Sequence, residues 1–108
     1  MSKPVKIVAL INKKFDDMSA EDFKEYWLNT HAPIVKKLKN LKGYRINVPI
    51  SEYQDLDVLP YEGSAELFWD SLDDMKEDFA SPEWAAAGED GPKFLEGFHL
   101  YMEEHIIL

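Results

Sequence analysis

Residues 23–38, FKEYWLNTHAPIVKKL, constrain the fold more than any other stretch, because they combine a helical apolar stripe with a proline. The stripe recurs at spacings of three and four, as on one side of a helix, and consists of Phe23, Tyr26, Trp27, Thr30, His31, Ile34 and Leu38. Pro33 lacks an N–H, clashes with the carbonyl four residues back and disfavours helical angles at Ala32. We therefore predict a helix that either kinks near His31 or ends there and restarts with Pro33 in its first turn.

Four other stretches have the signature of β-strands. Residues 5–11 are almost all β-branched or aliphatic, which is typical of a strand covered on both faces. The other three predicted strands combine alternation with aromatic or aliphatic residues and cover residues 44–48, 63–70 and 98–108. Residues 50–61 mix acidic and apolar residues without a period, and we predict a loop there that is suited to a partner contact.

Two short helices are predicted between the third and fourth strands. Ser71 with Asp74 forms a partial capping box for a helix over residues 72–79. Pro82 then opens a second helical stretch, which Gly88 is expected to end.

The predicted order is strand, helix, strand, strand, helix, strand, within a single domain over residues 1–108. Two right-handed βαβ crossovers on one sheet give an α+β, ferredoxin-like βαββαβ sandwich. Helices in such a fold cover one face of the sheet, yet residues 5–11 are apolar on both faces. We therefore expect a homodimer in which a second copy covers the open face and the two sheets enclose a central space.

The net charge of −9 over 108 residues argues against general nucleic-acid binding. The charge is uneven, since residues 1–45 hold ten Lys or Arg and five Asp or Glu, whereas residues 46–108 hold two and sixteen. Cysteine is absent, which excludes disulfides and a thiolate nucleophile and fits a cytoplasmic protein. No apolar run approaches the roughly 18 residues of a membrane span, and we expect neither a signal peptide nor membrane association.

Several motifs follow one another along the chain: F-x-x-Y-W-x-x-x-H-A-P-I over residues 23–34, Gly43-Tyr44-x-x-Asn47, G-x-A-E-L-x-x-D-S over residues 63–71, and Ser81-Pro82 with Asp90 and Phe94. This pattern resembles the EthD family, named after an operon for ethyl tert-butyl ether degradation. The resemblance implies a dimeric α+β barrel with a cavity in each subunit. Related barrels include lactone isomerases, polyketide cyclases, dehydratases and cofactor-free monooxygenases. In the methylmuconolactone methylisomerases, residues matching His31 and Tyr44 line the active site beside cysteines, which this chain lacks.

His31 is the leading candidate for chemistry, because it lies beside the predicted helix break. Carbonyls freed by Pro33 and the negative end of the preceding helix favour the imidazolium, whereas burial favours the neutral ring. Histidine can take and return a proton near neutral pH. The residues alone leave two roles open, proton transfer and a structural one in which the ring satisfies free carbonyls; the resemblance favours proton transfer.

Two further residues are catalytic candidates. Tyr44 begins a strand, and its phenol either hydrogen-bonds a substrate oxygen or packs in the core. Glu66 lies in a mid-sheet strand, where a carboxylate needs a partner, and the candidates are Arg45 and His31. The predicted ligand-binding residues are Asn12, Trp27, Phe68, Trp69 and Tyr101. The histidines lack metal-site spacing, and we expect neither a metal nor a cofactor.

These features predict a cofactor-independent catabolic enzyme that moves a proton on a small, mostly apolar, oxygen-containing molecule, as isomerases, cyclases and dehydratases do. His31 is then the general acid or base, and Tyr44 orients the substrate. Two alternatives stay open. One is an oxidoreductase of the cofactor-free or haem-using monooxygenase type. Such barrels use Asn, Trp and His residues, to which Asn12, Trp69 and a histidine of this chain are weakly similar. The other is a non-catalytic dimeric protein that binds a small molecule.

Overall fold

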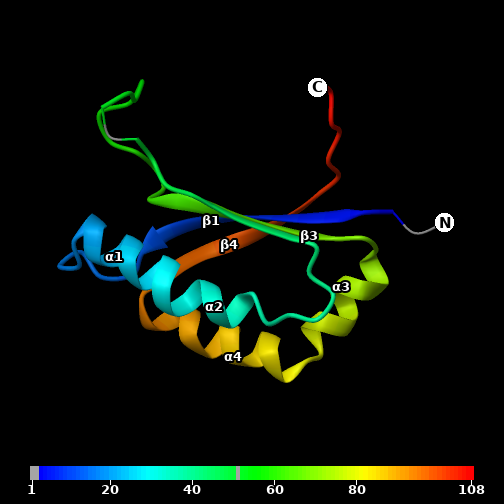
Figure 1. The fold of residues 1–108 in the computed structure, drawn as a ribbon. Coiled ribbons are helices and arrows are strands. Elements are labelled where there is room, and N and C mark those ends of the chain that lie inside the picture. The colour runs from blue at the N-terminus through cyan, green and yellow to red at the C-terminus, as the bar shows by residue number, and fades with distance from the viewer. Residues whose placement is uncertain (1–2, 51) are drawn as a thin grey trace.

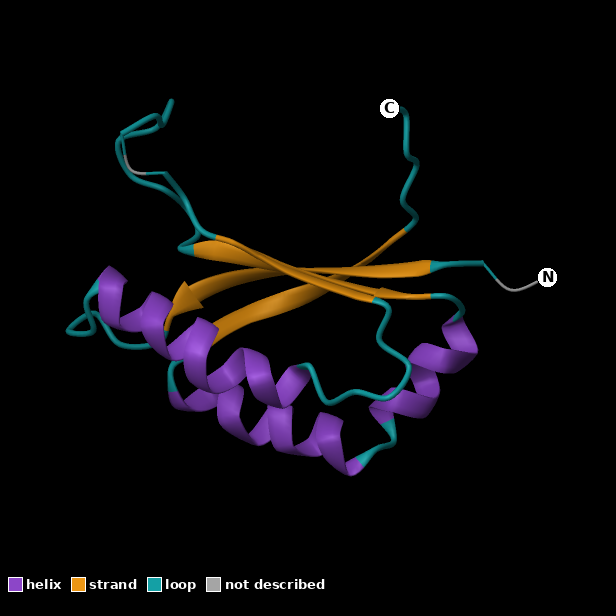
Figure 2. Cartoon of the chain, viewed as in Figure 1, coloured by secondary structure: helices purple, strands orange, loops and turns teal. Residues whose placement is uncertain are grey.

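The computed structural model describes residues 3–50 and 52–108, in which one antiparallel sheet carries the helices on one face (Figure 1; Figure 2). The strands are β1 (Val5–Lys13), β2 (Gly43–Asn47), β3 (Gly63–Trp69) and β4 (Leu95–Met102). The helices are α1 (Ala20–Tyr26), η1 (Trp27–His31), α2 (Ala32–Val35), α3 (Leu72–Phe79), α4 (Pro82–Asp90) and η2 (Gly91–Lys93). This order confirms the predicted α+β, ferredoxin-like fold.

The sheet has the strand order β2-β3-β1-β4, so the apolar strand β1 lies in its interior. Ala9 of β1 lies opposite Ala65 of β3, and Ile7 lies opposite Tyr101 of β4. Because side chains alternate along a strand, each strand sends every second residue towards the helices. We call that side the covered face and the other side the open face.

Alternate apolar residues of the strands form the core together with the helices. On the covered face, Ile7, Leu67 and Trp69 are buried in the same core cluster as Phe23 and Phe94. Full burial of such side chains stabilises the fold by about 1.5–3 kcal/mol each. The predicted cap of α3 is confirmed, since the Ser71 hydroxyl accepts a hydrogen bond of 3.1 Å from the Asp74 N–H.

The helix containing Pro33 continues through the proline by means of one π-helical turn, η1. The Ala32 N–H bonds to the carbonyl of Trp27, five residues back, and this wider turn accommodates a residue that has no N–H. Ala32 keeps helical angles, with φ −55° and ψ −41°, so the prediction that Pro33 forces Ala32 out of the helix is wrong. The irregularity expected near His31 is the π turn itself.

Two predicted boundaries need correction. The last strand covers residues 95–102 rather than 98–108, because its ladder with β1 runs from Lys13 opposite Leu95 to Lys6 opposite Met102, close to the start of β1. The helix predicted to stop at Gly88 extends to Asp90, since a single glycine inside a helix costs only about 1 kcal/mol.

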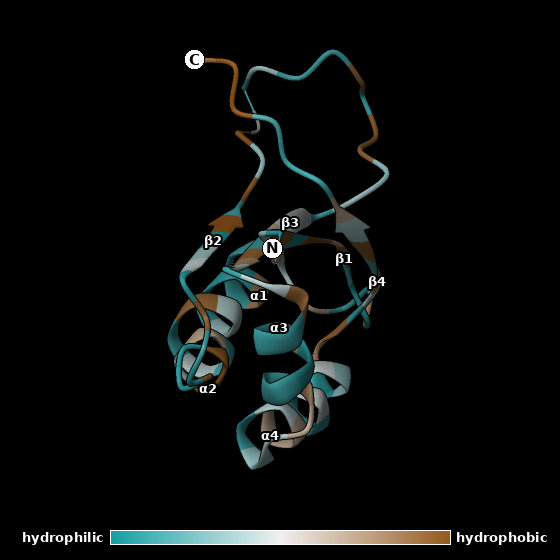
Figure 3. Ribbon diagram, turned by 90° about the vertical axis from the view of Figure 1, so that its right-hand side faces the viewer, coloured by the Kyte–Doolittle hydropathy of each residue, from teal (hydrophilic) through white to brown (hydrophobic). Residues whose placement is uncertain are grey.

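Two segments leave the sheet on the side of the open face, as Figure 1 and Figure 3 show. One joins β2 to β3 and contains the predicted loop of residues 50–61, of which Ser51 lies outside the described residues. The other is the chain after β4. Both carry exposed apolar side chains, among them Tyr53, Val58, Ile106 and Ile107.

Candidate active site

His31 ends the π turn and contacts Asp90, the last residue of α4. Its Nδ1 lies 2.9 Å from Oδ2 of Asp90, and the Tyr26 hydroxyl donates to Oδ1 of the same carboxylate at 2.8 Å. Residues five apart point to different sides of an α-helix, but a π turn brings them close to one side. The turn that accommodates Pro33 therefore lets Tyr26 and His31 hold one carboxylate together.

Asp90 is ionised although it is buried. Burial opposes its charge, but the hydrogen bonds from Tyr26 and His31 outweigh burial and lower the pKa of the carboxyl group. The hydrogen bond to Asp90 in turn raises the pKa of Tyr26. An ionised carboxylate only accepts hydrogen bonds, which assigns a proton to Nδ1 of His31. Nε2 of the neutral ring is then unprotonated and able to accept a proton.

His31 also lines a cavity of about 190 Å³ between the sheet and the helices. The sheet contributes Ala9, Ala65 and Leu67 to its lining, and the helices contribute Trp27 and Trp84. The lining is mostly apolar, with a few polar groups among its residues, as is common in small-molecule sites.

Two more polar side chains, Tyr44 and His99, line the same cavity. Burial raises the pKa of Tyr44 to about 12. His99 belongs to the exposed residues, with its ring centroid 6.1 Å from that of Trp84, and the burial of part of its surroundings lowers its pKa. Both groups are therefore uncharged near pH 7 and can hydrogen-bond an uncharged oxygen atom of a ligand.

The structure brings His31, Tyr44 and Trp27 to one cavity, but it places Glu66 on the open face. The Glu66 carboxylate pairs with Lys6 and accepts a hydrogen bond from Asn47 at 2.9 Å, and both contacts lower its pKa. Neither partner considered from the sequence makes the direct contact, although the charge of Arg45 also lowers the pKa of Glu66. His31 is bound by Asp90 instead, and Arg45 lies opposite Glu66 with its guanidinium 5.1 Å from the ring centroid of Phe68.

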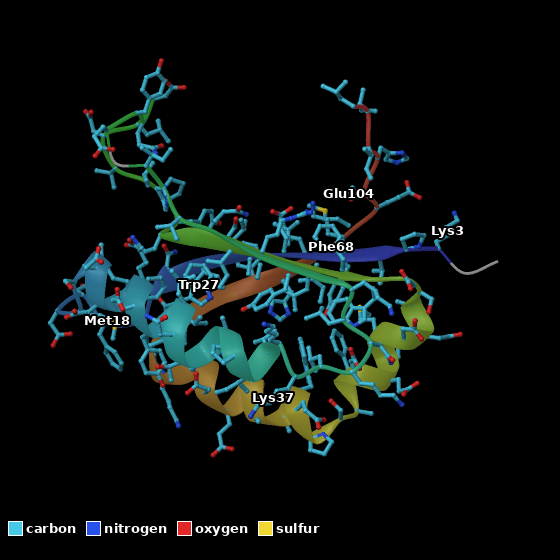
Figure 4. The ribbon with its side chains drawn as sticks, viewed as in Figure 1. Lys3, Met18, Trp27, Lys37, Phe68 and Glu104 are labelled. Atoms are coloured by element: carbon cyan, nitrogen blue, oxygen red, sulfur yellow. The ribbon has the colours of Figure 1, made fainter. Side chains whose placement is uncertain are left out.

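The other predicted ligand-binding residues also lie outside the cavity lining. Phe68 is on the open face, whereas Trp27 is on the side of the helices (Figure 4). Asn12 accepts a hydrogen bond of 3.2 Å from the Glu62 N–H. Trp69 is buried and donates its Nε1–H to Asp78 at 2.7 Å, which is a structural contact in the core. Tyr101 shares the covered face with Ile7 but is 59% exposed.

Asp90 was not predicted as a site residue, although it belongs to the motifs that resemble the EthD family. The available signal was its spacing. Asp90 follows Ala87 by three residues and precedes Phe94 by four, which predicts a carboxylate on the buried side of that helix. A buried carboxylate needs partners, and the polar side chains of Tyr26 and His31, on the apolar stripe of residues 23–38, were candidates.

Within residues 3–50 and 52–108, no group of three or more His, Cys, Asp or Glu side chains is arranged to hold a metal ion. In that same part of the chain, no helix is long and apolar enough to cross a membrane.

Comparisons with solved structures show the same fold in proteins of low sequence identity. An ethyl tert-butyl ether degradation (EthD) family protein from Bacillus halodurans is 22% identical with a TM-score of 0.75, covering 94% of this chain and 99% of that one. A dimeric protein of unknown function with a ferredoxin-like fold from Bacteroides fragilis is 20% identical with a TM-score of 0.67, covering 94% and 96%. SnoaB, a cofactor-independent oxygenase from Streptomyces nogalater, is 10% identical with a TM-score of 0.65, covering 99% and 98%. A comparison with curated protein sequences found no match.

The fold and the site define a small α+β protein with a histidine–aspartate pair beside an apolar cavity. The chain belongs to the EthD family, since the model of the EthD domain matches residues 16–98. This match confirms the resemblance found in the motifs.

Proposed function

We propose that this protein is an enzyme that uses His31 as a general base on a small, oxygen-containing molecule without the help of a cofactor. The observation that carries this proposal is the contact between His31 Nδ1 and the buried Asp90 carboxylate at the edge of an apolar cavity. A base fixed in one tautomer, next to space for a ligand, is the arrangement that proton abstraction requires.

Each residue of the site has a role in this reaction. Asp90 holds the Nδ1–H tautomer, so Nε2 accepts a proton from a carbon or hydroxyl group of the substrate. The same carboxylate stabilises the imidazolium that forms. Tyr44 stays protonated at neutral pH and donates a hydrogen bond to the substrate oxygen on which negative charge develops. Return of the proton to another atom completes an isomerisation, cyclisation or dehydration.

Hydrogen–deuterium exchange tests this proposal without knowledge of the natural substrate. Single-ring ketones and lactones are incubated with the protein in D₂O, and loss of the C–H signal next to the carbonyl is followed by NMR. We expect catalysed exchange for at least one compound and a loss of about 10²–10⁴-fold in rate for His31→Gln. Exchange that is equally fast with His31→Gln would refute the role of His31.

A second candidate function is cofactor-independent oxygenation, which the similarity in fold to SnoaB supports. The same proton abstraction from a hydroxylated ring compound gives an electron-rich anion that can react with O₂. In the balanced reaction a CH₂ group loses two hydrogen atoms and gains one oxygen atom, and the other oxygen atom leaves as water. Transfer of one oxygen atom from ¹⁸O₂ into a hydroxylated ring compound that carries a CH₂ group, abolished in His31→Gln, would favour this function over isomerisation. A haem-using monooxygenase, the other form of the oxidoreductase alternative, would instead give a Soret band when haem is titrated into the protein.

A non-catalytic binding function makes the opposite prediction for both assays. It predicts saturable ligand binding without exchange or oxygen transfer, and binding that His31→Gln leaves unchanged.

We also propose that the protein is a homodimer in which the open faces of two sheets meet, as in a dimeric α+β barrel. Apolar side chains on that face support this proposal, since Phe98 is 49% exposed and Met102 is 42% exposed. The relative from Bacteroides fragilis is described as dimeric, which also supports it. Sedimentation that shows a stable monomer at micromolar concentration would refute it.

A further inference from the structure

The cavity beside His31 is lined by small residues at positions that face one another across the space between the sheet and the helices. Ala9 and Ala65 lie directly opposite each other on β1 and β3, and both are buried on the covered face. Ala87 of α4 is buried on the helical side of the same cavity, and Gly88 and Gly91 lie near it in the chain and also line the cavity. Leu67 and Ile11 flank the alanine pair on the same strands with full-sized side chains. The alanines therefore set where the cavity lies and how large it is.

The described lining of the cavity holds no permanently charged side chain. Of the described residues that line it, none is Lys, Arg, Asp or Glu. Its polar side chains include His31, Tyr44 and His99. The Asp90 carboxylate, to which His31 and Tyr26 bind, is not part of the lining. A carboxylate or phosphate ligand would lose its water here without gaining a cation, which costs several kcal/mol. The lining therefore favours an uncharged ligand.

The volume of the cavity suits a ligand of about one ring. A dry, apolar protein cavity of about 150 Å³ accommodates benzene, and the cavity beside His31 is about 190 Å³. Sites for drug-sized molecules are larger, at about 300–1,000 Å³. A six-membered ring with one or two oxygen substituents matches this volume, and two or more fused rings would leave little or no free space in it.

From these observations we propose that the cavity binds a neutral, single-ring molecule that carries a hydroxyl or carbonyl oxygen, and that Ala9, Ala65 and Ala87 set the upper limit of its size. This inference rests on the proposed function, because that function makes the cavity the substrate site. Binding of the ligand does not require that the protein catalyses a reaction. It narrows the substrate class to ring compounds such as phenols, cyclic ketones and small lactones.

Two pairs of probes test size and charge separately by NMR titration of the ¹⁵N-labelled protein. The first pair is phenol and 1-naphthol. A larger ring system binds an unspecific apolar surface more tightly, because it buries more apolar area. At least tenfold tighter binding of phenol is therefore the signature of a size limit. The second pair is benzamide and benzoate, which have nearly the same shape but differ in charge. Benzamide is expected to bind at least tenfold more tightly at pH 7.

A pair of variants in α4 provides a matched control. Ala87→Leu fills the cavity and is expected to weaken phenol binding at least tenfold. Ala86→Leu makes the same substitution at an exposed neighbouring residue and is expected to change phenol binding less than twofold. Should Ala87→Leu fail to fold, Ala65→Val makes a smaller change on the opposite wall, with an expected loss of at least threefold.

Three outcomes would overturn the inference: 1-naphthol binding as tightly as phenol, benzoate binding as tightly as benzamide, or no saturable binding of phenol. Phenol binding that Ala87→Leu and Ala65→Val leave unchanged would overturn the assignment of the site to this cavity. Selective binding of the small neutral probes without any hydrogen–deuterium exchange supports this inference and refutes only the proposed catalysis.

Discussion

The two faces of the sheet are built from the same strands but carry different chemistry. On the covered face, Ala9 and Ala65 leave space beneath a histidine that a buried carboxylate orients. On the open face, to which the alternate residues of each strand point, Lys6 pairs with Glu66 beside the half-buried ring of Phe68. The comparison teaches that the role of a polar residue in the middle of a sheet cannot be inferred from its residue type alone. Its place in the two-residue alternation decides whether it lies on the covered face or on the open face.

The largest expected effect is on assembly. Phe98→Asp places a charge on the open face and should raise the dissociation constant of the dimer by roughly a hundredfold or more, because an unpaired charge would be buried between the two sheets. Tyr101→Asp is the matched control, since Tyr101 is similarly exposed on β4 but belongs to the other face. Sedimentation equilibrium measures both variants. An equal rise in the dissociation constant for both variants would contradict the proposal that only the open face forms the dimer interface.

The next effect is on the orientation of His31. Asp90→Asn keeps the shape of the side chain but removes the charge that fixes the Nδ1–H tautomer, and we expect the exchange rate in D₂O to fall about tenfold. Because a merely structural role would also lower activity by unfolding, the readout includes the ¹⁵N spectrum of His31. A fall in activity with an unchanged His31 tautomer would contradict the positioning role of Asp90.

Acid should weaken the fold through carboxyl groups on both faces. The pKa of Asp90 lies below its ordinary value of 3.8 and that of Glu66 lies below 4.5. A carboxyl group with a lowered pKa stabilises the folded state above its unfolded pKa, and this stabilisation is lost as the pH falls through the folded pKa. Urea unfolding should therefore show that Asp90→Asn is less stable than the wild-type protein at pH 7, with a difference that shrinks below about pH 4. A difference in the free energy of unfolding that stays constant with pH would contradict the lowered pKa of Asp90.

The smallest effect is expected for Glu66→Gln. Glu66 lies on the open face and pairs with Lys6, so its replacement should change the exchange rate less than about twofold, and its partly exposed ion pair contributes little to stability. Circular dichroism before the assay checks that the variant is folded. A loss comparable to that of Asp90→Asn would mean that the open face takes part in the reaction.

The order of elements and the location of His31 could be predicted from the sequence, because they depend on local patterns. Alternation predicts that Glu66 and Phe68 share a face, and the spacing within residues 23–38 predicts that Trp27 and His31 share one. The partner of Glu66 could not be predicted in this way. It depends on which residue of a neighbouring strand lies alongside, and Lys6 comes from a strand 60 positions earlier in the chain.

The partnership of His31 with Asp90 shows a second limit of sequence reasoning. Pro33 predicts an irregular turn, but its form as a π turn decides that Tyr26 and His31 point to the same side. Asp90 lies 59 residues further along the chain, and only the packing of the helices brings it to both side chains. Local spacing could place Asp90 on a buried face, but it could not identify the two groups that it binds.

The most direct test of the site is the ¹⁵N chemical shift of the His31 ring nitrogens in the wild-type protein at a pH where the ring is neutral. The structure predicts a protonated Nδ1 and an unprotonated Nε2, with the Nε2 signal moving when phenol is added. A ring protonated at Nε2, or an Nε2 signal that does not move at saturating phenol, would contradict the claim that the covered face carries the catalytic base.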